Sequence, residues 1–175
     1  MPDTYLVPEV IAAAGREVST ATSYPISASD IRKWALAVYY PGQPPAEFID
    51  PTAAAKTIHG GIVAPEEFNP FAWIIASHEK FIKNAGKVEN NNPDNTEISL
   101  GIEGPGLKFQ MNGGMVCEYG VRMRPGDVIT SESSVGEYSE REGRLGLMLF
   151  SRSISTWTNQ NGELVKRTTG TLIRY

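Results

Sequence analysis

The last third of the chain constrains the fold most, because its hydrophobic pattern changes there from helical to alternating. Strand-length runs rich in β-branched residues occupy 115–123, 127–138, 145–158 and 163–175. Residues typical of turns separate them: Arg124-Pro125-Gly126, Glu142-Gly143 and Asn161-Gly162. The beginning of the third run is apolar on both faces, as expected of a central strand. This order predicts a meander of long antiparallel strands.

The N-terminal third instead predicts helices and loops. Ser27, followed by Asp30, is a typical helix start, and Pro41-Gly42 ends that helix. Apolar residues recur on one face of it: Ile31, Trp34, Ala35 and Val38. Asp50-Pro51 combines an N-cap with a proline in the first turn, which predicts a short helix over 52–56.

Residues 68–82 form the most hydrophobic helical candidate of the chain. A helix this apolar needs cover on most of its circumference, so we expect a curved sheet to wrap around it. Residues from about 84 to 114 are rich in Asn, Gly and Pro, which predicts a long loop excursion. Together these patterns predict one α+β domain over 1–175, with a curved antiparallel sheet around a long hydrophobic helix.

Composition excludes several function classes. The 175 residues include 16 basic and 20 acidic side chains, a net charge of −4, which disfavours nucleic acid or anionic membranes as the main partner. No run approaches the roughly 18 to 20 apolar residues of a membrane span, and no leader pattern is present, so we expect a cytoplasmic protein. The single cysteine, Cys117, excludes a disulfide within the chain and a multi-cysteine metal site, and we expect no metal. With only His59 and His78 besides, catalytic options are few.

Motifs spread over nearly the whole chain resemble the MaoC-like dehydratase domain of the N-terminal type. They are Ser27-Ala28-Ser29-Asp30-Ile31-Arg32-Lys33-Trp34-Ala35, Gly60-Gly61-Ile62-Val63-Ala64-Pro65-Glu66-Glu67-Phe68, Arg124-Pro125-Gly126-Asp127-Val128-Ile129 and Gly170-Thr171-Leu172-Ile173-Arg174. The resemblance implies a hot-dog fold, pairing of two such folds, and an acyl thioester of coenzyme A or acyl carrier protein as substrate. It implies the reaction of (R)-specific enoyl-CoA hydratases and 3-hydroxyacyl dehydratases, with no cofactor besides the thioester itself.

Catalytic members of this family carry Gly-Asp-x-Asn-Pro-x-His-x-Asp in the loop after the first long helix. The carboxylate and the imidazole hold a water and exchange protons with the α-carbon and the 3-hydroxyl, while backbone N–H groups stabilise the thioester oxygen. Aligned without gaps between Gly42 and Asp50, the pattern places Gln43 at the Asp position and Phe48 at the His position. Neither side chain has a titratable proton, so neither can act as a general acid or base, and we assign no catalytic residue to this loop.

The resemblance therefore implies that this chain is one half of a two-part enzyme. That half has lost the catalytic pair of carboxylate and imidazole, here called the dyad, and shapes the acyl site. Its partner would be a dyad-bearing MaoC-like hot-dog subunit, and its substrate a bulky or long acyl chain from lipid metabolism or steroid side-chain degradation. The residues that the resemblance implies for acyl contact are Tyr40, Phe48, Ile62, Pro65, Phe68 and Phe71.

Two other functions stay open: a self-sufficient thioesterase or dehydratase with a relocated base, and an acyl-CoA binding module without turnover. His59 or a carboxylate outside the usual loop would be that base. Structural roles are favoured over catalytic ones for the single residues: an ordinary loop histidine at His59, a core or edge histidine at His78, an inert packed thiol at Cys117 and a turn-stabilising carboxylate at Asp127. Glu66 and Glu67 are expected at a helix start. Basic residues that could meet coenzyme A phosphates, or simply lie in solvent, are Lys56, Arg122, Arg124, Lys166 and Arg167.

Overall fold

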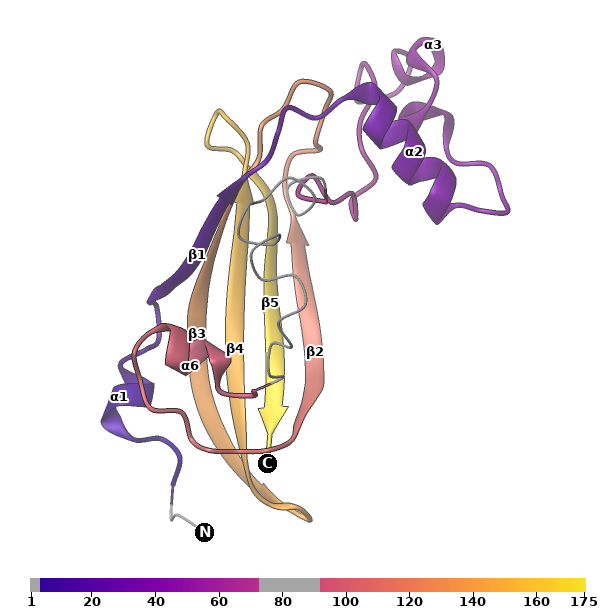
Figure 1. The fold of residues 1–175 in the computed structure, drawn as a ribbon. Coiled ribbons are helices and arrows are strands. Elements are labelled where there is room, and N and C mark those ends of the chain that lie inside the picture. The colour runs from indigo at the N-terminus through magenta and orange to yellow at the C-terminus, as the bar shows by residue number, and fades with distance from the viewer. Residues whose placement is uncertain (1–3, 73–91) are drawn as a thin grey trace, which may run out of the picture.

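A curved, five-stranded antiparallel sheet is the main element of the computed structural model, which describes residues 4–72 and 92–175. In spatial order the strands are β1 (Glu17–Thr22), β3 (Thr130–Gly143), β4 (Gly146–Thr158), β5 (Leu164–Arg174) and β2 (Gln110–Tyr119). Every neighbouring pair is antiparallel, and Figure 1 shows the sheet twisting along its length. The α+β class and the curved antiparallel sheet predicted from the sequence are confirmed.

Strand positions follow the predicted runs with shifted ends. β2 begins at Gln110 rather than 115, and β3 begins at Thr130 and continues to Gly143. The turn between β3 and β4 falls on residues 144–145, two residues after the predicted Glu142-Gly143. β1 lies in the third that we predicted to be helix and loop, and all of its residues are exposed. Without a buried face it has no alternating apolar pattern.

The helices are short except for α2 (Ala28–Val38). Ser27 caps it as predicted, its Oγ accepting from the Asp30 backbone N–H at 3.0 Å. Asp50 caps α3 in the same way. The other helical elements are α1 (Pro8–Ile11), η1 (Ala46–Phe48), α3 (Pro51–Ala54) and α6 (Asn95–Ser99). Figure 1 shows α2 and α3 beyond one end of the sheet and α1 and α6 near the other.

Two predicted segments need correction or lie outside the described residues. The expected excursion over 84–114 contains α6 and the first residues of β2 in the part that is described. Residues 70–72 of the expected helix over 68–82 form a turn, and its remainder, with His78, lies outside the described residues. Glu66 and Glu67 likewise lie in a turn rather than at a helix start.

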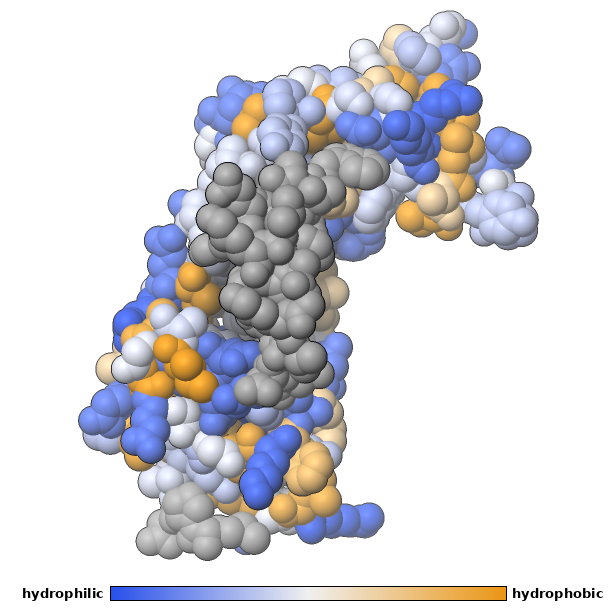
Figure 2. Space-filling model, viewed as in Figure 1, coloured by the Kyte–Doolittle hydropathy of each residue, from blue (hydrophilic) through white to orange (hydrophobic). Residues whose placement is uncertain are grey.

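The main apolar cluster lies where α2, η1 and the segment 62–71 meet the end of the sheet. Ile31 and Ala35 from α2 are fully buried there, against Ile129 and Val165 from the sheet end. On the outside of this helical lobe Leu36, Val38 and Ile58 remain exposed, and Figure 2 shows hydrophobic residues on that surface. Among the described residues, no helix has the length and apolar character needed to cross a membrane.

Candidate functional site

The loop at residues 42–50, here called the dyad loop, connects α2 to α3 and includes η1 (Figure 1). Gln43 is exposed, whereas Pro44 beside it is buried. Phe48, at the end of η1, is only 5% exposed. The two positions predicted for a catalytic pair therefore differ in environment, one in solvent and the other in the apolar cluster.

Arg122 holds Phe48 from the sheet side. Its guanidinium carbon lies 5.8 Å from the centre of the Phe48 ring, and the Tyr39 ring lies 6.1 Å from it. The guanidinium is itself fixed, because Nε and Nη2 donate to the Ala64 carbonyl at 3.2 and 2.6 Å and Nη1 lies 3.5 Å from Glu66. The positive charge of Arg122 attracts the face of an aromatic ring such as that of Phe48. It would repel a second positive charge, such as a protonated histidine, at position 48.

The carboxylates of the dyad loop are Glu47 and Asp50. Asp50 Oδ1 accepts from the backbone N–H groups of Thr52 and Ala53 at 2.8 and 3.2 Å, so this carboxylate serves as the cap of α3. The Glu47 carbonyl accepts from Val63 at 3.4 Å, which ties the dyad loop to the segment that follows. Within the ranges 4–72 and 92–175, no cluster of His, Cys, Asp and Glu side chains is arranged to hold a metal.

The residues predicted for acyl contact are partly brought together. Phe48 and Phe68 are both buried in the apolar cluster, and Ile62 and Phe71 pack against it half-buried. Pro65 is buried at the start of a turn, and its carbonyl accepts from the Phe68 backbone N–H at 3.0 Å. Tyr40 lies apart from them with 82% of its surface exposed.

His59, Arg122 and Arg124 line a polar groove of about 540 Å³. Arg124 Nη2 donates to the His59 carbonyl at 2.7 Å, so this arginine fixes the loop that carries the histidine. Asp127 accepts from the Arg124 backbone at 2.8 Å and from the Gln160 side chain at 3.1 Å, the turn-stabilising arrangement expected for it. The groove brings two of the predicted basic residues together, with their polar groups largely engaged in the protein's own contacts.

The other predicted basic residues lie elsewhere. Lys166 is 7% exposed, and its Nζ lies 2.8 Å from Glu67 between the rings of Tyr119 and Trp157. Lys56 and Arg167 are exposed, and Arg167 lies 3.5 Å from Glu118. Cys117 is half-buried on β2, 3.8 Å from the Thr168 hydroxyl.

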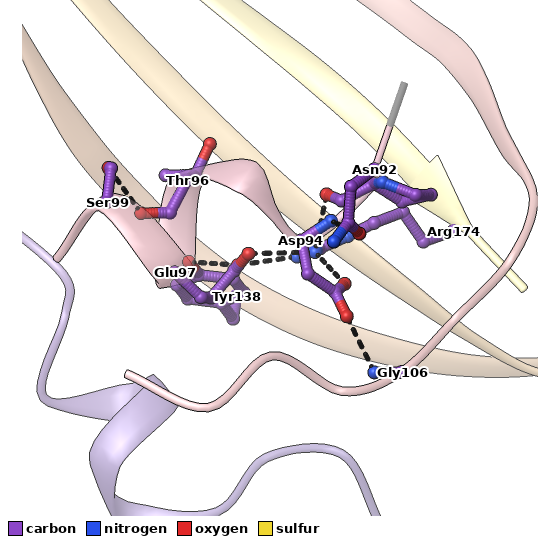
Figure 3. A network of polar contacts seen from close by, with 9 residues as sticks. Asn92, Asp94, Thr96, Glu97, Ser99, Gly106, Tyr138 and Arg174 are labelled. Atoms are coloured by element: carbon purple, nitrogen blue, oxygen red, sulfur yellow. Dashed lines mark hydrogen bonds and ion pairs between the residues drawn. The ribbon is translucent and has the colours of Figure 1, made fainter. Parts of the chain in front are cut away.

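A buried ion cluster formed by Arg174, Glu97, Asp94 and Tyr138 was not predicted from the sequence (Figure 3). Arg174 Nη2 and Nη1 donate to the two Glu97 carboxylate oxygens at 2.7 and 3.0 Å, and Nη1 also donates to Asp94 at 2.9 Å. Tyr138 donates to Glu97 Oε1 at 2.6 Å. The cluster joins α6 to the sheet, and its three charged side chains are almost fully buried.

Hydrogen bonding decides the ionisation of Glu97. Burial alone would raise the pKa of its carboxyl, but the hydrogen bonds from Arg174 and Tyr138 outweigh burial and hold that pKa below its usual range. Burial and the hydrogen bond to Glu97 raise the pKa of Tyr138. Glu97 is thus a stabilised anion facing an arginine, which makes it a poor proton acceptor.

The sequence contains one signal for this cluster. Asp94 and Glu97 are spaced as neighbours on one helix face, next to an Asn-rich run, and Arg174 is near the chain end. No local sequence pattern links Arg174 to these two carboxylates, because about 80 positions separate it from them.

Comparison with known proteins places these features in a family context. The family model described as FAS1-like, dehydratase domain region, matches residues 12–168. No curated protein is similar enough in sequence to match the chain.

Solved structures share the fold at low sequence identity. The MaoC-like dehydratase from Rhodospirillum rubrum has a TM-score of 0.53 at 19% identity, over 90% of each chain. The ChsH1-ChsH2 complex from Mycobacterium tuberculosis has a TM-score of 0.59 at 17% identity, and the match covers 95% of this chain and 87% of that chain. The HadBC (3R-hydroxyacyl-ACP dehydratase) complex from the same organism has a TM-score of 0.51 at 17% identity, and the match covers 90% of this chain and 98% of that chain.

Proposed function

The chain belongs to the family described as FAS1-like, dehydratase domain region, and on that premise we propose that it is the substrate-shaping, non-catalytic subunit of a heteromeric enoyl-thioester hydratase. The reaction is the addition of water to a trans-2-enoyl thioester, or the reverse dehydration of a 3-hydroxyacyl thioester. The acyl chain is bulky or long and is carried by coenzyme A or acyl carrier protein. Two of the structural neighbours are themselves complexes, ChsH1-ChsH2 and HadBC.

The chemistry defines what each subunit supplies. Hydration forms a C–O bond at C3 and a C–H bond at C2, so one group must take a proton from water while another delivers one to the α-carbon. In this proposal the partner supplies the carboxylate and the imidazole. This chain contributes apolar walls that hold the acyl group and exclude water, and the residues proposed to contact the acyl group are Ile62, Phe68 and Phe71.

The single observation that carries the proposal is the environment of the dyad loop. Gln43 has no titratable group, and Phe48 packs as an aromatic core residue with Arg122 above its ring. A buried phenylalanine held by a cation supports a structural role for this loop. A relocated base at Glu97 is disfavoured, because Arg174 and Tyr138 stabilise its anion.

An exposed sheet edge supports the proposed partner. β2 is the edge strand beyond β5, and it exposes apolar side chains, with Val116 at 71% and Met115 at 63%. An uncovered apolar edge strand can pair with a strand of another subunit. We propose that the dyad-bearing subunit docks along β2, which would join the two sheets.

The proposal predicts a specific complex. The partner to use is the hot-dog protein of the same genome that carries the Gly-Asp-x-Asn-Pro-x-His-x-Asp loop. Size-exclusion chromatography with light scattering should show a heteromer, and Val116→Lys should weaken assembly at least tenfold, because a lysine charge would be buried at the interface.

Val18→Lys is the matched control, since Val18 is a 40% exposed valine on β1, the opposite edge. It should assemble like the unsubstituted chain. Absence of any complex between the unsubstituted proteins would overturn the proposal. Equal loss from both variants would show that β2 is not the docking edge.

A further inference from the structure

Lys166 on β5 carries a charge that the fold buries among three other elements. The residue is only 7% exposed, and its Nζ lies 2.8 Å from Glu67 Oε2. The same nitrogen lies 5.2 Å from the centre of the Tyr119 ring on β2 and 5.5 Å from that of the Trp157 ring on β4. The Tyr119 hydroxyl donates to the other carboxylate oxygen of Glu67. Lys166 therefore links both neighbouring strands to the turn that carries Glu67.

This ion pair does little for the stability of the fold. The Lys166 side chain is 9% exposed, whereas the Glu67 side chain is 61% exposed, so the lysine loses its hydration to a partner that keeps its own. Removing a cation from water costs more than so unequal a pair returns, and an apolar side chain would fill the same place as well. What the lysine adds is a fixed contact between the turn and the sheet.

The two groups that Lys166 holds lie next to the aromatic residues proposed for acyl contact. Glu67 directly precedes Phe68 in the chain. The Trp157 ring meets the Phe71 ring edge-on, with 5.1 Å between the ring centres. Lys166 therefore fixes the position of Phe68 through Glu67, and that of Phe71 through Trp157.

A small hollow beside Phe68 has room for the end of an acyl chain. Its volume is about 190 Å³, and Trp34 and Ala37 of α2 form its apolar walls together with Phe68. Trp34 also meets the Phe68 ring edge-on, with 5.6 Å between the ring centres. Sites for whole small molecules occupy roughly 300–1,000 Å³, so this hollow fits part of a chain. A displacement of the turn that carries Phe68 would change its shape.

We propose that Lys166 is a positioning residue for acyl recognition. By holding Glu67 and Trp157, it keeps Phe68 and Phe71 where the distal part of a long acyl chain contacts them. This role rests on the proposed function, which takes the ligand to be an acyl thioester. It makes the preference for long acyl groups over short ones depend on Lys166.

Calorimetric titration with dodecanoyl-CoA and butanoyl-CoA measures that preference without turnover. Both thioesters carry the same coenzyme A group, and only the longer one reaches the aromatic walls. The unsubstituted chain, by itself and with the dyad-bearing partner, should bind dodecanoyl-CoA at least a hundredfold more tightly. Lys166→Met should reduce this preference about tenfold, the equivalent of losing contact with roughly two methylene groups, and should leave butanoyl-CoA binding unchanged. The urea midpoint should not move, because the carboxylate left behind is exposed.

Two further variants make the test decisive. Glu67→Gln breaks the same ion pair from its exposed side and should reduce the preference in the same direction, even if Lys166→Met fails to fold. Arg167→Met is the matched control, because this neighbour on β5 is exposed and pairs with Glu118, and it should keep the full preference.

Equal weakening of both thioesters, or an unchanged preference in Lys166→Met and Glu67→Gln, would overturn the role of Lys166. Absence of any preference in the unsubstituted chain would overturn it as well. A preference that these variants reduce, in a chain that forms no complex with the partner, would uphold the role of Lys166 and count against the proposed function.

Discussion

Replacing Arg174 with Met is expected to lower the free energy of unfolding by about 3–5 kcal/mol, the cost of removing one partner of a buried ion pair. Met fills much of the same volume but leaves the Glu97 and Asp94 carboxylates, which are 0% and 5% exposed, without their cation. Since the cluster joins α6 to the end of β5, the loss should be cooperative. Urea denaturation followed by circular dichroism measures it.

Arg167→Met is the matched control on the same strand. Arg167 is exposed, and its pair with Glu118 at 3.5 Å lies in solvent, so the change should stay within about 1 kcal/mol. Similar midpoints for the two variants would contradict the structural role assigned to the cluster.

The pH dependence of stability should follow the same cluster. The folded-state pKa of Glu97 is lowered, so its contribution is complete above the ordinary carboxyl pKa and is lost as pH falls through the depressed value. Unfolding free energies measured between neutral and acidic pH should therefore fall less steeply for Glu97→Gln than for the unsubstituted chain. Parallel curves would show that Glu97 is not held as an anion.

Restoring the family's acid and base at the dyad loop is expected to cost stability without creating activity. Phe48→His exchanges a ring that is 5% exposed for a polar one inside the apolar cluster, at a cost of about 3 kcal/mol, within the range for losing a large apolar core side chain. Arg122, 5.8 Å from the ring centre, would oppose protonation of the imidazole. An Asp at position 43 would lie in solvent, away from that imidazole.

Gln43→Asp alone is the control, because this exposed residue should tolerate the change within about 0.5 kcal/mol. The assay compares hydration of trans-2-dodecenoyl-CoA by the unsubstituted chain, by Gln43→Asp, and by the variant with both substitutions. Hydration gained only by the double variant would show that positions 43 and 48 converge on substrate after all.

Local signals predicted the parts of this fold that depend on local chemistry. Ser27 and Asp50 cap helices where the sequence places them, since a cap needs only its own next few residues. The long strands β3 to β5 were found because turn residues separate them. β1 was missed because it has no buried face, and the pattern of alternating burial is the signal on which strand prediction depends.

Contacts between distant residues explain what the sequence could not show about the site. Phe48 was identified as an unusual residue in the dyad loop, but its contact with Arg122 depends on how the loop meets the sheet. Arg174 and Glu97 are far apart in sequence, and each alone resembles an ordinary surface charge. The burial of Lys166 could not be predicted for the same reason, since only the fold brings it next to Glu67 and the rings of Tyr119 and Trp157.

The most direct measurement of the central claim is the rate of trans-2-dodecenoyl-CoA hydration by the purified chain, by the dyad-bearing partner, and by their complex. The account predicts no rate above buffer for the chain alone and at least a hundredfold greater rate for the complex, which is lost when the partner's Asp and His are replaced. Hydration by the chain alone, at a rate that the partner does not change, would contradict it.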